Sequence, residues 1–230
     1  IKKVQILHPK RKDCHLQPVY VKEMLVMGLP MGLQFSITAI GSMVMQSANN
    51  GLGSIYVSGF TAGMRIKQFA MCPFDALANG VSVFCSQNLG AGKIKRIRKG
   101  LWQGVGVGFI YGLLIGLVLI FAGRSLSMLF ISADQTAVLD ASAKYLRCLG
   151  FFYWSLGPLS VFRMSAQGMG FSGRAIFSGV TEMIARTFVS FAFVGTYGFT
   201  AICFADQTAW VSATLYITPV CLMCLRQVTR

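Results

Sequence analysis

The chain has 230 residues, of which 54% are hydrophobic and 12% are charged. A charged share of about 25% is usual in soluble globular domains, so the composition excludes an ordinary soluble domain. Lys and Arg outnumber Asp and Glu by 21 to 7, a formal net charge of +14. The positions of these charges indicate membrane topology, and we expect no nucleic acid among the partners.

Long runs without Asp, Glu, Lys or Arg divide the chain, and the first of them covers residues 24–64. A helix that crosses the hydrocarbon core needs about 20 apolar residues, and Asn49-Asn50-Gly51 is typical of a turn, so this run predicts two helices. In chain order we predict spans at 22–47, 55–88, 101–123, 142–168, 174–196 and 206–225. The predicted fold class is therefore all-α, a polytopic membrane protein with a bundle of six transmembrane helices.

Most cations fall on one side of this predicted bundle. With six spans, the basic segment 1–21 with the adjoining Lys22, the loops near 90–100 and 169–174, and the tail 226–230 share a side that holds 14 of the 21 cations. Because Lys and Arg are retained in the cytoplasm during insertion, we expect both termini to be cytoplasmic. The expected location is a plasma membrane, in a multi-pass topology, with a bacterial inner membrane favoured.

Polar residues recur at helical spacing inside three of the predicted spans. Since lipid offers no hydrogen bonds, we expect these faces to look into protein or into a water-filled cavity. Interhelical hydrogen bonds that only hold the bundle together are the alternative. The three faces are Gln34, Thr38, Ser42 and Gln46; Gln68, Cys72, Asp75, Asn79, Ser82 and Ser86; and Arg174, Ser178, Glu182, Arg186 and Ser190.

Glycines and prolines predict where helices approach closely or bend. The third span carries a glycine every four residues from Gly100 to Gly116, which predicts close contact with another helix and no nucleotide site. Gly28-x-Pro30-x-Gly32 and Gly157-Pro158 predict kinks, because proline removes a backbone hydrogen bond.

Asp75 is placed in mid-span, where a carboxylate could bind a proton, a cation or a cationic substrate. The alternative is a structural ion pair with Arg65, Lys67 or Arg163. Glu182 and Arg186 are one helical turn apart in the order that favours an ion pair, and we expect this pair to be structural. Arg163 shares a face with Gln167, and its side chain is expected to extend toward the interface.

The sequence gives no support for an enzyme or a metal site. Cys221-x-x-Cys224 has no second pair of ligands, and Asp13-Cys14-His15 with His8 is a weak cluster in a basic segment. No catalytic triad or paired-carboxylate arrangement stands out. We therefore expect neither a metal nor another cofactor.

Four strings resemble the carboxy-terminal half of the multidrug and toxic compound extrusion (MATE) family. They are Gly28-Leu-Pro-Met-Gly-Leu-Gln34, Gln87-Asn-Leu-Gly-Ala-Gly92, Arg163-Met-Ser-Ala-Gln-Gly-Met-Gly170 and Gly179-Val-Thr-Glu-Met-Ile-Ala-Arg186. The resemblance covers essentially all of residues 20–228. It implies one lobe of a two-lobe, twelve-helix antiporter that exports cationic or amphipathic organic compounds in exchange for H⁺ or Na⁺.

The resemblance also implies partners and shows departures from the family's pattern. The expected partners are membrane lipids, a small-molecule substrate, and an amino-terminal lobe or second half-transporter. Thr38 stands where some members have an acidic residue. Lys67 stands where an acidic residue is frequent, and Asp75 stands where an uncharged residue is frequent. The resemblance therefore assigns the coupling of transport to an ion to no residue of this chain. The candidates for a substrate or ion pathway are Gln34, Thr38, Asp75, Asn79, Arg163, Gln167, Glu182 and Arg186.

Two other functions stay open at this stage. A flippase for lipid-linked sugars of the same superfamily would need a cavity rich in arginine, to which Arg163 and Arg186 could contribute. A half-transporter without transport activity of its own, which only inserts or associates with another lobe, is the third possibility.

Overall fold

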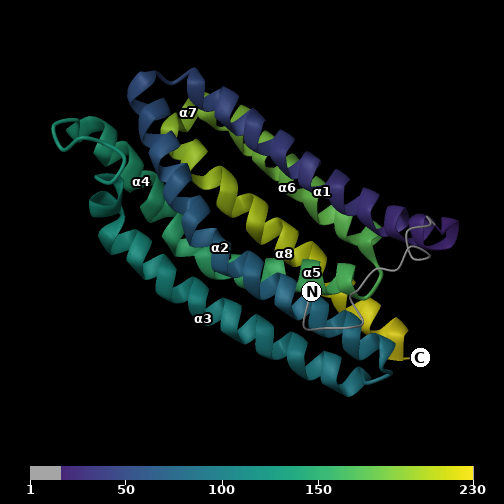
Figure 1. Cartoon of the computed structure of the whole chain (residues 1–230). Helices are drawn as coiled ribbons and strands as arrows, with labels where there is room; N and C mark the ends of the chain where they lie inside the picture. Colours follow the sequence, from purple (N-terminus) through teal and green to yellow (C-terminus); the bar gives the residue numbers. More distant parts are fainter. Residues whose placement is uncertain (1–16, 230) are drawn as a thin grey trace.

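The computed structural model describes residues 17–229, and within that range every regular element is helical. The helices are α1 (Pro18–Asn50), α2 (Ser54–Gly90), α3 (Ile94–Ser127), α4 (Thr136–Phe152), α5 (Leu156–Gly168), α6 (Ser172–Ala192), α7 (Val194–Tyr197) and α8 (Phe199–Thr229), with a 3₁₀ turn η3 (Tyr153–Ser155) between α4 and α5. The long helices lie side by side along one direction (Figure 1). This confirms the predicted all-α bundle.

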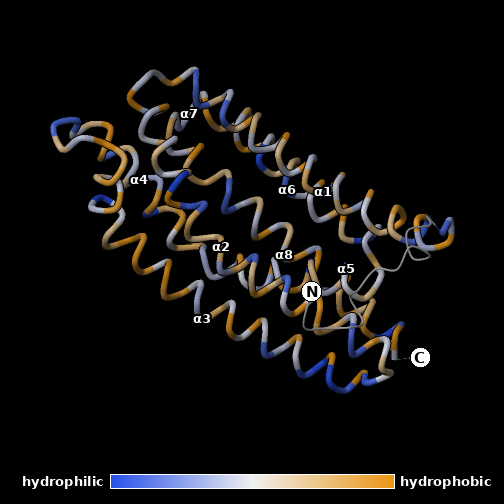
Figure 2. The backbone as a smooth tube through the Cα atoms, viewed as in Figure 1, coloured by the Kyte–Doolittle hydropathy of each residue, from blue (hydrophilic) through white to orange (hydrophobic). Residues whose placement is uncertain are grey.

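Five helices, α1, α2, α3, α6 and α8, are long and apolar enough to cross a membrane. The fourth predicted span is α4, η3 and α5 in succession, which run along α3 and complete six passages. Figure 2 shows hydrophobic residues along the shafts of the helices, whereas hydrophilic residues gather at turns such as the one between α2 and α3. Many large apolar side chains are exposed, as a lipid-facing surface requires.

The predicted bounds need correction at several ends. The first helix begins at Pro18 instead of residue 22, and the last helix covers Phe199–Thr229 instead of 206–225. The predicted segment 1–21 therefore overlaps α1, and the predicted tail 226–230 overlaps α8. The remainder of the basic segment, with His8 and Asp13-Cys14-His15, lies outside the described residues.

Glycines on α3 let α4, η3 and α5 approach as predicted. Gly104, Gly108, Gly112 and Gly116 are all buried. A Cβ atom added to Gly116 would lie 2.5 Å from the carbonyl oxygen of Gly150, and one added to Gly112 would lie 2.7 Å from the Cα atom of Trp154. The glycine stripe is thus a packing surface.

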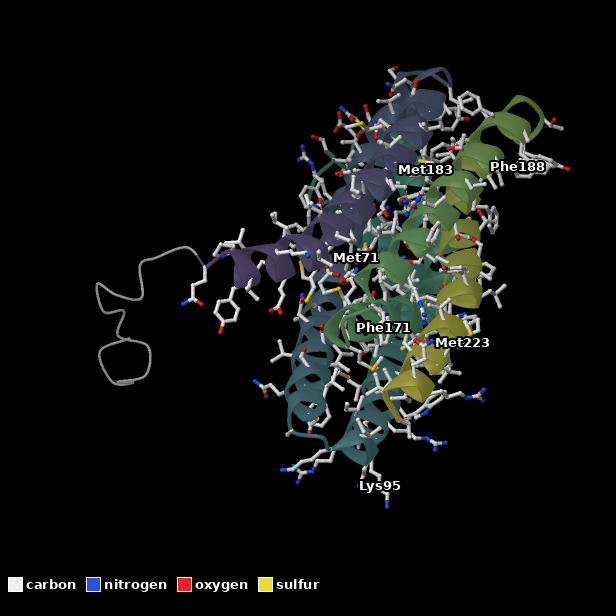
Figure 3. All side chains as sticks on the ribbon, turned by 90° about the vertical axis from the view of Figure 1, so that its right-hand side faces the viewer. Met71, Lys95, Phe171, Met183, Phe188 and Met223 are labelled. Atoms are coloured by element: carbon white, nitrogen blue, oxygen red, sulfur yellow. The ribbon has the colours of Figure 1, made fainter. Side chains whose placement is uncertain are left out.

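The break in the fourth span lies just before the predicted Gly157-Pro158 kink. Residues Tyr153–Ser155 form a 3₁₀ turn, and α5 begins at Leu156. Pro158 has no N–H to donate to the carbonyl of Trp154, four residues earlier, so the α-helical ladder is interrupted there. Helix α1 continues through Pro30 and changes direction along its length (Figure 3).

The packing order separates α1 from α2 in the bundle. Helix α1 packs mainly on α6 and α6 on α8, whereas α2 packs on α3, α4 and α5. Gly41 brings the backbones of α1 and α6 together, since a Cβ atom there would lie 3.0 Å from the Cα atom of Met183, which is labelled in Figure 3. Consecutive helices α1 and α2 make few contacts with each other.

Candidate functional site: a buried ionic network beside an exposed carboxylate

Five charged side chains from four helices form one continuous network inside the bundle. They are Lys67 on α2, Arg163 on α5, Glu182 and Arg186 on α6, and Asp206 on α8. Their side chains are between 0% and 14% exposed. An unpaired charge in such an environment is strongly unfavourable, so the pairing holds these helices in one arrangement.

Asp206 is the centre of this network. Its Oδ2 atom accepts hydrogen bonds from Lys67 Nζ at 2.7 Å and from the Tyr145 hydroxyl at 2.8 Å. Its Oδ1 atom accepts one from Arg186 Nε at 2.9 Å. The carboxylate therefore joins α2, α4 and α6 to α8 with both of its oxygens occupied.

Glu182 joins the network to α5. Its Oε2 atom lies 3.4 Å from Arg186 Nη2, which confirms the predicted pair one helical turn apart. Its Oε1 atom accepts a hydrogen bond from Arg163 Nη2, and Arg163 Nε donates to the Ser178 hydroxyl at 2.9 Å. The expectation that Arg163 extends toward the interface is therefore wrong, because its guanidinium turns inward to a buried carboxylate.

Asp206 is a residue of the network that the sequence did not predict. The predicted sixth span, 206–225, puts Asp206 at its very end, but α8 begins seven residues before Asp206 and that side chain is fully buried. The runs 187–205 and 207–225 are both free of charged residues, so Asp206 is the single charge within 39 otherwise uncharged positions. That isolation was the signal for an intramembrane acid.

Asp75 is the third acid within the spans, and its setting is different. It is exposed on α2, and no salt bridge involves it within residues 17–229. The alternative of a structural ion pair is wrong for each cation considered, since Lys67 pairs with Asp206, Arg163 pairs with Glu182, and Arg65 lies over the Phe130 ring. Asn79, one turn further along, is also exposed and donates to the Asp75 carbonyl at 2.8 Å.

The predicted polar faces of α1, α2 and α6 differ in burial. On α2, four members of the predicted face, Gln68, Cys72, Asp75 and Asn79, are exposed in succession. On α1, Gln34 is buried and Thr38 is half-buried, and the backbone carbonyl of Thr38 accepts from Arg186 Nη1 at 3.3 Å. On α6 the face is buried from Ser178 to Ser190, as predicted.

Gln34 and Gln167 join α1 to α5 beside the ionic network. Gln167 Nε2 donates to Gln34 Oε1 at 2.6 Å, and both residues are buried. An isolated buried amide that loses its partner costs about 1–3 kcal/mol, whereas replacement of both partners by apolar groups can be nearly neutral.

We expect Gln34→Leu to lower the free energy of unfolding by about 1–3 kcal/mol, because the Gln167 amide keeps no partner. The double variant Gln34→Leu, Gln167→Leu should recover most of that loss. Thermal unfolding of the purified chain in detergent measures both effects. A double variant that is as unstable as the sum of the two single variants would show that the pair contributes nothing of its own.

No group of three or more His, Cys, Asp or Glu residues that could hold a metal ion occurs in the part of the chain that the structure describes. Cys221 and Cys224 are buried free thiols on α8, and Arg174 Nη1 lies 3.6 Å from the sulfur of Cys224.

These features define a polytopic helical membrane protein that combines a buried ionic network with one uncovered polar helix face. The sequence pattern of the MatE family matches residues 30–191, well over half of the chain. The chain belongs to the MatE family, whose members are membrane transporters.

Curated relatives and solved structures agree with this assignment. Over 178 residues the chain is 28% identical to the probable multidrug resistance protein YpnP of Bacillus subtilis, covering 77% of this chain and 38% of that protein. A crystal structure of a MATE protein in complex with MaL6 shares its fold with a TM-score of 0.90 at 16% identity. An outward-facing multidrug resistance MATE transporter gives a TM-score of 0.91 at 15% identity.

The two structures are each matched over 100% of this chain and 52% of their own length. The chain therefore spans about half the length of the solved structures and less than half that of YpnP. A third similar structure, from Pyrococcus furiosus, is described as having a binding pocket of reversed polarity that suggests a different function.

Proposed function

We propose that the chain is one lobe of a secondary transporter that exports cationic or amphipathic organic compounds in exchange for H⁺ or Na⁺. The other lobe would be an amino-terminal half or a second half-transporter. The side of this bundle that carries the polar faces of α1 and α2 would face it. Family membership and the name of YpnP, a probable multidrug resistance protein, support this proposal. So does the exposed polar face of α2.

The observation that carries the proposal is the difference in ion pairing among the three intramembrane acids, Asp75, Glu182 and Asp206. Glu182 and Asp206 are each bound to two cationic side chains, so neither is free to receive another cation. Asp75 is exposed and has no such partner within residues 17–229. A carboxylate of this kind inside a membrane lobe is the group to which an organic cation or a coupling ion would bind.

The same contacts argue against a lipid-linked sugar flippase. A pyrophosphate needs arginines with free donors, but Arg163 and Arg186 both donate to buried carboxylates or to neighbouring oxygens. Binding of an anion there would have to break ion pairs first. Export of cations therefore fits the charge arrangement better.

We place the lobe in a plasma membrane with both termini in the cytoplasm. The turn between α2 and α3 and the start of α3 lie at the end of the bundle where α8 finishes (Figure 1), and this segment carries Lys93, Lys95, Arg96, Arg98 and Lys99. The opposite end holds Arg124, paired with Asp140, and Lys144, which donates to Thr200 at the start of α8. The more basic end is the one expected to stay in the cytoplasm.

Asp75→Asn should reduce export of a cationic dye at least severalfold, because the amide keeps the shape of the carboxylate but not its charge. Ethidium efflux from cells that produce the protein, with any lobe that accompanies it, measures this at several pH values. Asp75→Glu is the matched control and should keep a large part of the activity. Efflux by Asp75→Asn that equals the original at every pH would remove Asp75 from the mechanism.

A further inference from the structure

A shallow apolar groove of about 350 Å³ runs between α2 and α3 near the turn that joins them. It is lined by Leu77, Gly80, Val81 and Phe84 from α2 and by Gly100, Gln103, Gly104 and Val107 from α3. Phe84 and Val107 are 39% and 56% exposed, so the walls of the groove are accessible from outside the bundle. The groove is open beside Gly80, where an added Cβ meets nothing within 4 Å, whereas Gly104 is covered by Val81.

This groove faces away from the polar side of α2. An α-helix turns about 100° per residue, so the groove positions 77, 80, 81 and 84 lie opposite the polar positions 75, 79, 82 and 86. The groove is therefore on the surface that looks toward lipid, and Asp75 and Asn79 are on the other side of the same helix.

A separate basic hollow lies at the turn between α2 and α3, and its residue Arg96 is one helical turn from Gly100 of the groove. Gly92, Lys93, Ile94, Lys95 and Arg96 line this hollow. Arg96 belongs to the same stripe of α3 as Gly100, Gln103 and Val107, at steps of three and four residues, and Lys93 caps the start of that helix. Lys95 projects from this end of the molecule in Figure 3.

The positive charge of this turn is not compensated by ion pairs. Lys93, Lys95, Arg96, Arg98 and Lys99 are all exposed, and the salt bridges found within residues 17–229 involve none of them. Trp102, which lies one to two helical turns beyond Arg96 on α3, is 48% exposed. Exposed tryptophan is typical of the level at which headgroups meet acyl chains.

We propose that the hollow and the groove together bind one anionic phospholipid. Lys93 and Arg96 would hold the headgroup phosphate, and an acyl chain would lie along Leu77, Val81, Phe84 and Val107. Basic clusters next to a membrane span attract anionic lipid at about 1 kcal/mol per Lys or Arg. The apolar groove in line with the cluster turns this general attraction into a site for a single lipid, independent of any transported compound.

The test compares lipid binding by the purified chain in detergent, using native mass spectrometry. The probes are phosphatidylglycerol and phosphatidylcholine with identical acyl chains, and inorganic phosphate alone. The headgroup variant is Lys93→Gln with Arg96→Gln. Its matched control is Arg98→Gln with Lys99→Gln, which removes the same charge from the same turn at positions that do not line the hollow.

We expect the headgroup variant to weaken phosphatidylglycerol binding roughly 30-fold and the control pair to change it less than threefold. If the headgroup variant and the control pair lost the same affinity for phosphatidylglycerol, the proposal would be overturned in favour of diffuse electrostatic attraction. Equal binding of the two lipids by the original chain would overturn it as well. Phosphate that binds as well as the lipid would overturn the role of the groove.

A second variant tests the groove without changing any charge. An added Cβ at Gly80 meets nothing within 4 Å, so Gly80→Phe should fill the groove while the helices keep their packing. We expect it to weaken phosphatidylglycerol binding severalfold. Gly106→Phe is its control, since Gly106 is also free of neighbours within 4 Å but does not line the groove. Equal binding by these two variants would show that no acyl chain occupies the groove.

Discussion

Asp206→Ala should lower the free energy of unfolding by about 3–5 kcal/mol, because Lys67 and Arg186 would both remain buried without that carboxylate. Tyr145 would lose its acceptor as well, although Met64 Sδ is 3.2 Å from its hydroxyl. Thermal unfolding in detergent, followed by circular dichroism, measures the loss. The amount of monodisperse protein recovered from membranes measures it independently.

Asp140→Ala is the matched control for this experiment. Asp140 also pairs with an arginine, Arg124, at 3.0 Å, but the two side chains are 66% and 50% exposed. Exposed ion pairs contribute about 0–1 kcal/mol, so the control should unfold close to the original temperature. If Asp206→Ala and Asp140→Ala were equally stable, the buried network would not hold the helices together.

Gly116→Val should destabilise the bundle by about 1–3 kcal/mol or more, because overpacking of a tight helix contact displaces backbone. The new Cβ would lie 2.5 Å from the carbonyl oxygen of Gly150, which belongs to the backbone of α4 and cannot rotate away. The clash should push α3 away from α4. Thermal unfolding in detergent, followed by circular dichroism, measures the loss of stability.

Gly106→Val provides the control on the same helix. Gly106 is exposed, and a Cβ added there meets nothing within 4 Å. The Gly106→Val variant makes the same change of residue type without the clash. Its unfolding temperature should therefore stay near that of the original protein. Equal destabilisation by both variants would assign the effect to helix propensity and not to the contact between α3 and α4.

Much of the fold follows from the sequence because bilayer thickness fixes the length of apolar runs. The predicted spans each correspond to a helix or a helical pair. The helix ends follow less directly from the sequence: the predicted spans leave 197–205 as a loop, but the seven residues from Phe199 to Ala205 are helical. Apolar loop residues such as Ile202 and Cys203 pack into the bundle, and only the tertiary contacts reveal this.

The candidate site was predicted in part. Helical spacing placed Ser178, Glu182 and Arg186 on one inward face, and the Glu182–Arg186 pair follows from local geometry. The partners of Lys67 and Arg163 are 139 and 19 residues away in the chain, so no local pattern selects them. For the same reason, spacing could not show that Asp75, unlike Glu182 and Asp206, forms no salt bridge within residues 17–229.

The most direct test of the account is ion movement in proteoliposomes that contain the protein with any lobe that accompanies it. An imposed gradient of tetraphenylphosphonium should drive H⁺ or Na⁺ in the opposite direction, detected with a pH-sensitive or sodium-sensitive dye inside the vesicles. We predict that Asp75→Asn reduces this exchange at least severalfold at an unchanged amount of folded protein. Exchange that is absent from the original protein, or that persists undiminished in Asp75→Asn, would contradict the account.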